Sequence, residues 1–341
     1  MHTRAPLTRL LLICLAIFIL LSASVQANPR KYTSGVNEFI ADMAKKHGFE
    51  KQSLAALMAL ARYSQAVIDS MERPYEAKPW HIYRPLFVSA DRINNGVDFW
   101  NANADLLNKA ERIYGVPPQI IVATIGVETK YGKFMGKHLV LDALTTLAFT
   151  YPKRQRLFRK QLEAYILLLS EEDIDPATTH GSYAGAIGKP QFIPGSYREY
   201  AIDFDGDGKR DLLNNTADAI GSVANYYRRH GWRQGDPVAA PAIVNGGDYH
   251  EHLSLEPKPT KPTTTIAELG DAGVKTGRKL PTSTRCNLIE FDAGTTKEYW
   301  LGFYNFYVIT RYNHNNQYAM AVYQLSQKIL DQRKARSKKH G

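Results

Sequence analysis

The chain has 341 residues, and its 43 lysine and arginine residues outnumber 33 aspartate and glutamate residues, which gives a formal net charge of +10. This length excludes a single small domain and allows a sizeable core shared by two or three subdomains. A basic balance can indicate nucleic-acid binding, but the N-terminal signal described next favours peripheral association with the anionic cell envelope and no nucleic-acid partner.

The N-terminus has the three parts of an export signal. Arg4 and Arg9 precede an apolar run over residues 10–21, which ends in small residues up to Ala27. This pattern predicts a cleavable signal peptide over residues 1–27. A membrane-spanning helix needs about 20 apolar residues, so this run is short for that role. We therefore expect a soluble periplasmic protein.

The two cysteines add little to the fold. Cys14 follows Leu12-Ile13 inside the apolar run, whereas lipid attachment requires a small residue before the cysteine, so no lipid anchor is expected. Cys286 is the single cysteine of the mature chain. An intramolecular disulfide is therefore excluded, and the core must hold the fold unaided.

The hydrophobic pattern divides the mature chain into three parts, and the predicted class is α+β, mainly α. Residues 28–107 have helical periodicity and form a helical domain. Residues 234–300 are rich in proline and contain short alternating stretches, which predict a small β-containing insert. Helical patterns on both sides, over residues 108–233 and 301–332, predict a core that the insert interrupts. Residues 333–341 form a basic tail.

The first candidate for chemistry is Glu128. Pro117 and Pro118 suit the start of a helix and Gly132 its end, and between them Glu128 is the only acidic residue of a nearly all-apolar helix. Burial and the negative end of the helix dipole both raise the expected pKa of Glu128, so it could deliver a proton to a glycosidic oxygen. The alternative is a carboxylate that reaches solvent or pairs with Lys130.

A second candidate is the segment over residues 181–197, which has four glycines and two prolines. These residues predict a loop dominated by its backbone, with Ser182 and Gln191 as hydrogen-bonding groups. Such a surface lets a polymer approach closely. The alternative is a structural connector between helices.

Three motifs together carry a family resemblance: residues 126–132 (Gly-Val-Glu-Thr-Lys-Tyr-Gly), residues 185–188 ahead of Gln191-Phe192, and residues 218–226. Shorter matches extend over nearly the whole mature chain: Phe99-Trp100, Asp142-Ala143-Leu144, Tyr151-Pro152, residues 311–314 and residues 318–322. The chain resembles the lytic murein transglycosylase B family. This resemblance implies a goose-lysozyme-like core with an N-terminal helical domain and a small β insert.

The resemblance also implies the reaction. The family cleaves the β-1,4 bond between N-acetylmuramic acid and N-acetylglucosamine in peptidoglycan glycan strands, and leaves 1,6-anhydromuramoyl ends. Glu128 matches its single acid and base, no cofactor is needed for catalysis, and the N-acetyl group of the substrate replaces a second carboxylate. Two alternatives stay open: a lysozyme-type muramidase that hydrolyses the same bond, and a non-catalytic wall-binding calcium module. We expect a monomer.

Substrate contacts are carried over from the same family. Ser182 and Gln191 match residues that bind substrate near the scissile bond, and Lys153 and Arg154 could pair with peptide-stem carboxylates. The groove is expected to be lined by Tyr83, Tyr226, Tyr312, Asn313 and Tyr318. For each tyrosine the alternative is a packing role. One departure from the family is Lys189-Pro190, which replaces a Tyr-Gly pair.

The third candidate is a calcium loop that begins at Asp203. Asp203, Asp205 and Asp207 occupy positions 1, 3 and 5, and glycine follows at position 6, as in the first half of an EF-hand. Position 12 is not acidic, and the resemblance implies that Asp218 closes the shell instead. The expected ligands are these four aspartates and the Lys209 carbonyl, around a structural calcium. The alternative is a calcium-free turn.

Overall fold

The computed structural model describes residues 29–73, 78–172, 174–254 and 259–340. The predicted signal peptide, residues 1–27, lies outside these ranges. No helix within them is both long enough and apolar enough to cross a bilayer. The described chain is mainly helical and carries one small five-stranded sheet, so the predicted class is confirmed.

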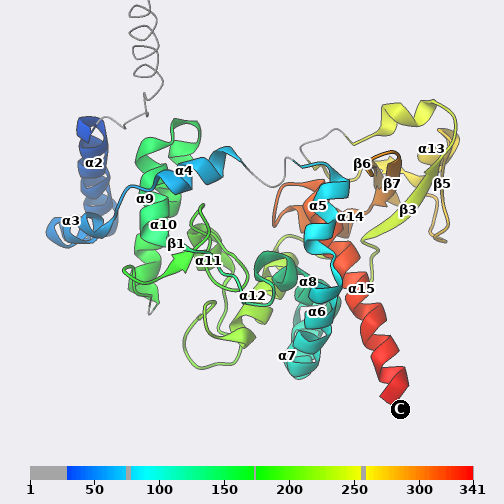
Figure 1. Cartoon of the computed structure of the whole chain (residues 1–341), viewed down its shortest axis with the longest axis horizontal. Coiled ribbons are helices and arrows are strands. Elements are labelled where there is room, and N and C mark those ends of the chain that lie inside the picture. Colours follow the sequence, from blue (N-terminus) through cyan, green and yellow to red (C-terminus); the bar gives the residue numbers. More distant parts are fainter. Residues whose placement is uncertain (1–28, 74–77, 173, 255–258, 341) are drawn as a thin grey trace, which may run out of the picture.

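The N-terminal part is a series of helices. Phe39 and Met43, one turn apart on the first of them, are buried, and Phe39 packs edge-on against Phe149 with ring centroids 5.9 Å apart. Two helices from this part, α2 and α3, lie beside α9 and α10 at one end of the molecule (Figure 1). In chain order the elements are α2 (Pro29–His47), α3 (Lys51–Leu60), α4 (Gln65–Glu72), α5 (Trp80–Phe87), α6 (Ala90–Ala102) and α7 (Ala104–Tyr114).

The core consists of helices from both sides of the insert. The central one, α8, packs against α6, α7, α12 and α15, so the last helix of the chain closes the core. The elements are α8 (Pro118–Thr129), β1 (His138–Leu139), α9 (Val140–Thr150), the short 3-10 helix η2 (Pro152–Arg154), α10 (Gln155–Glu171), β2 (His180–Gly181), α11 (Pro194–Tyr200), α12 (Thr216–Arg229), α14 (Tyr304–Thr310) and α15 (Asn316–His340).

Local sequence explains the limits of α8. Pro117 has an extended backbone and Pro118 occupies the first helical position, where no amide donor is needed. Every residue of α8 is buried except Gln119 and Glu128. The helix ends because Lys130 adopts a left-handed conformation, with φ 49° and ψ 51°, and its amide bonds back to the last turn.

The insert is an antiparallel sheet in the order β4-β6-β7-β3-β5. Its buried side chains, Cys286 and Leu288 among them, form a small second core. The sheet lies at the opposite end of the molecule from α2 (Figure 1). Its elements are β3 (Ala239–Val244), η3 (Asp248–His252), β4 (Thr264–Thr265), α13 (Ile266–Asp271), β5 (Val274–Thr276), β6 (Arg285–Asp292) and β7 (Lys297–Gly302). These strands coincide closely with the predicted insert, residues 234–300, although the domain boundaries themselves stay a prediction.

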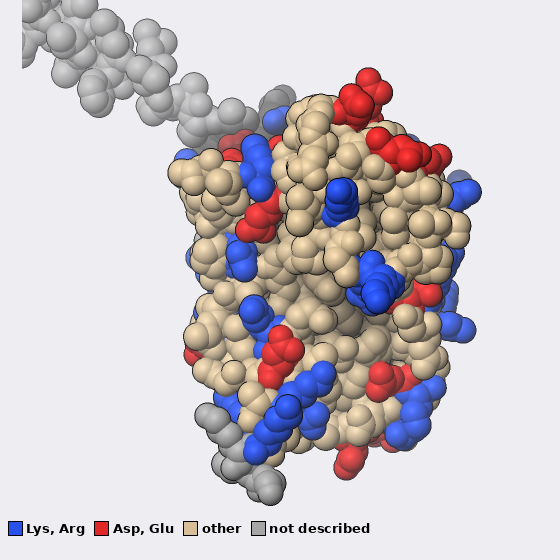
Figure 2. Space-filling view, turned by 90° about the vertical axis from the view of Figure 1, so that its right-hand side faces the viewer, with Lys and Arg blue, Asp and Glu red and all other residues tan. Residues whose placement is uncertain are grey.

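The predicted basic tail continues a helix. Residues 333–340 are the final turns of α15, and the side chain of Arg336 reaches α6, where it pairs with Asp98 at 2.7 Å. Figure 2 shows the face that carries the insert, with charges of both signs interspersed and a hollow near the middle. The excess of basic residues therefore does not gather into one patch on this face.

Candidate active site

Glu128 lies at the end of α8, where the helix meets the edge of the core. It is half-buried, whereas its neighbours in the helix are buried. Tyr318, in the first turn of α15, donates its hydroxyl hydrogen to Glu128 Oε1 at 2.5 Å. Since Tyr318 is only 3% exposed, this contact fixes one carboxyl oxygen.

Aromatic side chains from three parts of the chain gather beside this carboxyl group. Tyr312 stacks on Tyr318 at 6.3 Å and contacts Tyr226 at 4.7 Å and Tyr227 at 5.6 Å between ring centroids. Burial, and next the negative charge of Glu128, raise the pKa of Tyr227, Tyr312 and Tyr318. These hydroxyls therefore stay protonated and act as donors. Tyr227 is absent from the predicted set.

Two of the predicted tyrosines bind backbone through their hydroxyl groups. Tyr312 donates to the Pro190 carbonyl at 2.6 Å, and Tyr226 donates to the Arg311 carbonyl at 2.5 Å. Each bond joins segments that are far apart in the sequence. The tyrosines thus tie the loops around Glu128 together.

The glycine-rich segment forms a compact loop in which both predicted side chains bond to the backbone. Ser182 Oγ accepts the Ala186 amide hydrogen at 3.0 Å. Gln191 has a φ of 50°, and its side-chain nitrogen donates to the Met135 and Gly188 carbonyls at 3.0 and 2.9 Å. Their contact with substrate stays a prediction.

The Lys189-Pro190 pair connects this loop to α8 and to the tyrosines. Thr129 Oγ1, directly after Glu128, donates to the Lys189 carbonyl at 2.9 Å, and Lys189 Nζ donates to the Leu213 carbonyl at 2.8 Å. Together with the bond from Tyr312 to the Pro190 carbonyl, these contacts hold Lys189 and Pro190, the pair that departs from the family pattern, in place. The loop therefore keeps a defined shape without the Tyr-Gly pair.

The remaining predicted residues lie on other elements. Tyr83, on α5, is 1% exposed, and its ring packs 4.7 Å from that of Phe87. Lys153 and Arg154 are exposed on η2. Asn313 is half-buried in the turn between α14 and α15. Their roles in binding substrate stay predictions.

A buried arginine that was not predicted supports the end of α8. Arg92, on α6, is 5% exposed and donates to the carbonyls of Gly126 and, at 3.0 Å, Leu86. The first of these bonds gives a second donor to the Gly126 carbonyl in the last turn of the helix that carries Glu128, which also accepts the Lys130 amide hydrogen. A signal existed in the sequence, because Arg92 shares a helical face with Gly96 and Trp100.

The aspartate loop brings three of its predicted ligands together. Carboxylate oxygens of Asp203, Asp205 and Asp218 all lie within 4.8 Å of one another. Calcium binds oxygens at about 2.3–2.6 Å, so one ion can reach all three. Asp207 is not part of this group, and its Oδ1 instead accepts the Lys209 amide hydrogen at 2.9 Å.

Asp218 is the buried member of this cluster. It is fully buried at the start of α12, and its two oxygens accept the amide hydrogens of Phe204 and Asp211, both at 2.8 Å. Burial first, and then the charges of Asp205 and Asp203, raise its pKa. The three carboxylates therefore oppose one another unless a cation joins them.

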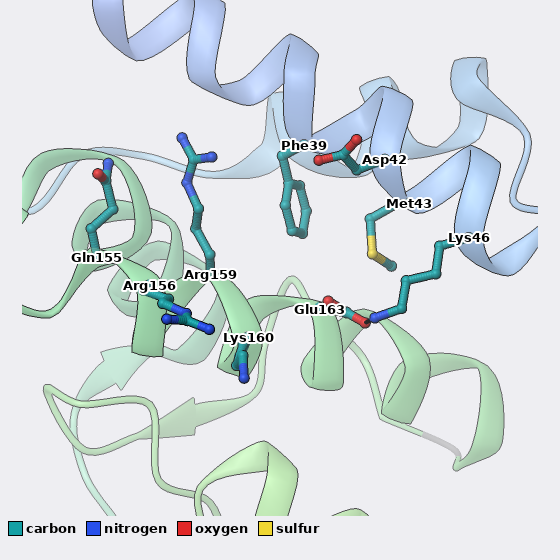
Figure 3. Close-up of a pocket in the computed structure, with 9 residues that line it drawn as sticks. All are labelled: Phe39, Asp42, Met43, Lys46, Gln155, Arg156, Arg159, Lys160 and Glu163. Atoms are coloured by element: carbon teal, nitrogen blue, oxygen red, sulfur yellow. Dashed lines mark hydrogen bonds and ion pairs between the residues drawn. The ribbon is translucent and has the colours of Figure 1, made fainter.

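The molecule also has a cavity away from these sites. It has a volume of about 410 Å³ and lies between α2 and α10, where Lys46 of α2 pairs with Glu163 of α10, the helix that also carries Arg156 and Lys160 (Figure 3). Glu128 is not among its lining residues. The candidate active site is therefore identified from Glu128 and the residues that contact it, and not from this cavity.

Comparisons with known proteins agree with this geometry. Residues 31–327 match the family described as the transglycosylase SLT domain. The chain is 43% identical over 308 residues to membrane-bound lytic murein transglycosylase B of Escherichia coli K12, a match that covers 86% of this chain and 81% of the relative.

Two solved structures share the fold. Soluble lytic transglycosylase SltB1 from Pseudomonas aeruginosa has a TM-score of 0.81 and 44% identity, with 87% of this chain and 99% of that chain covered. Lytic transglycosylase Slt35 from E. coli, in a complex with calcium, has a TM-score of 0.79 and 44% identity, with 88% and 93% covered. The matches span the helical part, the core and the insert alike, and the chain belongs to the transglycosylase SLT-domain family.

Proposed function

We propose that this protein is a peptidoglycan lytic transglycosylase that cleaves the β-1,4 bond between N-acetylmuramic acid and N-acetylglucosamine and leaves 1,6-anhydromuramoyl ends. The observation that carries the proposal is the half-buried carboxyl group of Glu128, held by the Tyr318 hydroxyl in a chain of this family. The relatives described above are themselves named lytic transglycosylases.

In the first step Glu128 acts as an acid. Its protonated carboxyl group donates a proton to the glycosidic oxygen, and the bond from that oxygen to C1 of the muramoyl residue breaks. Tyr318 donates to Oε1 of the same carboxyl group and holds it in position for this transfer. The positive charge that develops at C1 is stabilised by the N-acetyl oxygen of the same sugar.

In the second step the same residue acts as a base. The Glu128 carboxylate takes the proton from the muramoyl 6-hydroxyl, and the oxygen of that hydroxyl group forms the new bond to C1. Glu128 returns to its starting protonation state, and no water enters the product. The bond from Tyr318 favours the carboxylate between the two steps, since a donor stabilises the anion.

Substitution of Glu128 tests this proposal. Glu128→Gln keeps the shape of the side chain and removes the proton, so muropeptide release from purified sacculi should fall by about 10²–10⁴-fold. The melting temperature and glycan binding should not change. Release within tenfold of wild type would overturn the assignment and favour a non-catalytic wall-binding module.

Mass spectrometry of the products separates the two enzymatic alternatives. A transglycosylase yields anhydromuropeptides, whereas a lysozyme-type muramidase yields products heavier by one water. Hydrated ends alone would show that water, and not the 6-hydroxyl, attacks C1.

We propose further that the cluster of Asp203, Asp205 and Asp218 holds a structural calcium ion. The proposal is supported by the spacing of the three carboxylates and by the calcium complex of the E. coli relative. Bound calcium would supply only positive charge to the fold. Asp207 and the Lys209 carbonyl, the other two expected ligands, stay part of the proposal.

We also propose that the protein is exported to the periplasm, with cleavage after Ala27. The basic start and apolar run of residues 1–27 support this proposal. The E. coli relative is named membrane-bound, which agrees with work at the cell envelope. In this proposal the protein acts as a monomer, and its partner is the peptidoglycan glycan strand.

A further inference from the structure

The turn between α14 and α15 carries two basic side chains beside residues that are expected to line the groove. Arg311 directly follows α14, and His314 lies two residues before the start of α15. Between them lie Tyr312 and Asn313, and Tyr312 stacks on Tyr318 beside the proposed catalytic carboxyl group. Arg311 is half-buried and His314 is exposed, so a bound molecule can reach both.

Three contacts hold Arg311 in place. Its guanidinium group lies 5.6 Å from the centre of the Tyr307 ring, and its Nη1 donates to His314 Nδ1 at 3.2 Å. Its backbone carbonyl accepts the hydroxyl hydrogen of Tyr226, a ring of the cluster beside Glu128. The side chain is therefore preorganised, and a ligand that binds it does not have to immobilise a freely rotating group.

The bond from Arg311 determines the state of the His314 ring. A guanidinium group only donates, so His314 Nδ1 accepts, and the neutral ring carries its hydrogen on Nε2. Burial first, and then the charges of Arg311 and His230, lower the pKa of His314, which agrees with a neutral ring. The turn therefore presents guanidinium N–H groups and one imidazole N–H, and all of them are donors.

Arg311 differs from other arginines around α12 and α14 in having no acidic partner. Arg229 lies 3.5 Å from Glu199, and Arg233 lies 3.9 Å from Asp236. Among the described residues, the two partners of the Arg311 guanidinium group are neutral rings. Removing a charge from water without a counter-ion is unfavourable, so an anion from outside the chain would stabilise this half-buried group.

The chemistry of these donors favours a carboxylate. A guanidinium group binds a carboxylate through two parallel N–H···O bonds, and the imidazole N–H can add a third. In the polymer of the proposed function the N-acetylated sugars are neutral, and the carboxylates belong to the peptide stems. Each stem leaves the muramoyl sugar whose C1 reacts at Glu128, and a peptide spans at most about 3.6 Å per residue. The stem of the reacting unit is therefore a nearby source of carboxylates for the turn that carries Tyr312.

We propose that Arg311, supported by His314, binds a carboxylate of the peptide stem on the muramoyl unit whose bond is cleaved. The proposal deepens the proposed function and rests on it, because its ligand is part of the same substrate. The site lies on a different element from Lys153 and Arg154 of η2, the residues expected from the family resemblance to pair with stem carboxylates. Arg311 would thus select strands whose stems are charged.

The test compares two soluble glycan substrates: strands with intact stems, and the same strands with their stem carboxylates converted to neutral amides. Arg311→Gln should raise KM for intact strands by about tenfold, as expected for the loss of a hydrogen bond to a charged group, and should leave kcat unchanged. On amidated strands Arg311→Gln and the wild type should have equal KM values, since neither can form the contact. The rate of anhydromuropeptide release gives both constants.

Two further variants accompany this comparison. Arg229→Gln is the matched control, because it removes an arginine that already pairs with Glu199, and its KM should stay within about twofold of wild type on both substrates. His314→Ala, at an exposed position, removes the neutral donor and should raise KM by about two- to fivefold on intact strands only.

A purely structural role for Arg311 predicts a different pattern. If the side chain only positioned the turn that carries Tyr312, Arg311→Gln would lower kcat, or raise KM equally, on both substrates. Either result, or an unchanged KM for intact strands, would overturn the proposal.

Failure of the proposed function is a distinct outcome. The proposed function is decided by the products and by the loss of release in Glu128→Gln, whereas the role of Arg311 is decided by comparing intact with amidated strands. The same comparison can be made as strand binding to Glu128→Gln with and without Arg311→Gln, which requires no cleavage.

Discussion

The hydroxyl of Tyr318 donates to one oxygen of Glu128, the residue proposed to transfer the proton. Burial and the carboxyl charge raise the pKa of that hydroxyl, so it stays protonated and can donate to Glu128. The position of Glu128 near the end of an apolar helix could be predicted from spacing alone. Its contact with Tyr318 could not, because helical periodicity contains no information on which distant segment covers a helix end.

Replacing Tyr318 by phenylalanine tests this contact. Tyr318→Phe removes a hydrogen bond to a charged group, which is worth about 1.5–3 kcal/mol, so kcat for muropeptide release should fall by about 10–100-fold. Tyr323→Phe is the control. Tyr323 lies on the same helix as Tyr318, but its hydroxyl donates to the backbone carbonyl of Ala239 at 3.0 Å and not to Glu128. Equal rates for the two variants would show that Glu128 works without this donor.

The buried carboxyl group of Asp218 should make stability depend on pH when calcium is removed. Its raised pKa means that the folded state holds this proton more tightly than the unfolded state. The protonated Asp218 carboxyl group therefore contributes to the free energy of unfolding below the usual aspartate pKa, about 4. This contribution is lost as pH rises through the higher pKa of Asp218 in the folded state.

Asp218→Asn isolates this effect. In a chelator, the free energy of unfolding of wild type minus that of Asp218→Asn should decrease as pH rises from about 4. Urea unfolding over a pH series measures the difference. A difference that is constant or rises with pH would contradict the assigned cause, namely burial beside Asp203 and Asp205.

At the scale of elements, α8 shows where prediction from sequence ends. The prolines correctly mark its start, but its predicted end at Gly132 is three residues too late. Lys130 and Tyr131 both adopt positive φ values, which are uncommon for residues other than glycine and leave no pattern in the sequence. Tyr131 is held there by a bond from its hydroxyl to the Arg92 carbonyl at 2.7 Å.

Arg92 should be important for stability because it supports this helix end from inside the core. Arg92→Leu removes the charged donor to the Gly126 and Leu86 carbonyls, and the free energy of unfolding should fall by about 1.5–3 kcal/mol. Arg112→Leu, at an exposed position on α7, is the control and should change stability by less than about 0.5 kcal/mol. A small loss for Arg92→Leu would mean that the backbone bond from Lys130 to Gly126 is enough to hold this helix end.

The insert illustrates a second limit at this scale. Prolines and alternating stretches identify residues 234–300 as a β-containing segment, because strands have a period of two. The strand order β4-β6-β7-β3-β5 depends on pairing between distant segments, which composition does not encode.

At the scale of the whole molecule, calcium should act on stability and not on turnover. A ligand that binds only the folded state at 100 times its dissociation constant adds about 2.7 kcal/mol, which raises the melting temperature by several degrees. Calcium titration followed by thermal unfolding measures this shift. Muropeptide release at low temperature should be the same in calcium and in chelator.

The cluster of Asp203, Asp205 and Asp218 determines which variants test calcium binding. Asp203→Asn with Asp205→Asn removes two of the three clustered groups and should abolish the calcium-dependent shift. Asp248→Asn with Asp271→Asn makes the same change of charge at exposed positions outside the loop and should retain it. Identical melting of wild type in calcium and in chelator would mean that the loop is an ordinary turn.

The hydrogen bond between Tyr318 and Glu128 joins residues 190 positions apart, and this separation affects biosynthesis. A ribosome releases the chain from its N-terminus, so Glu128 emerges long before its partner does. An unfinished or truncated chain then carries the acidic residue without α15, which closes the core around it. Completion of the polypeptide thus becomes a condition for pairing Glu128 with Tyr318.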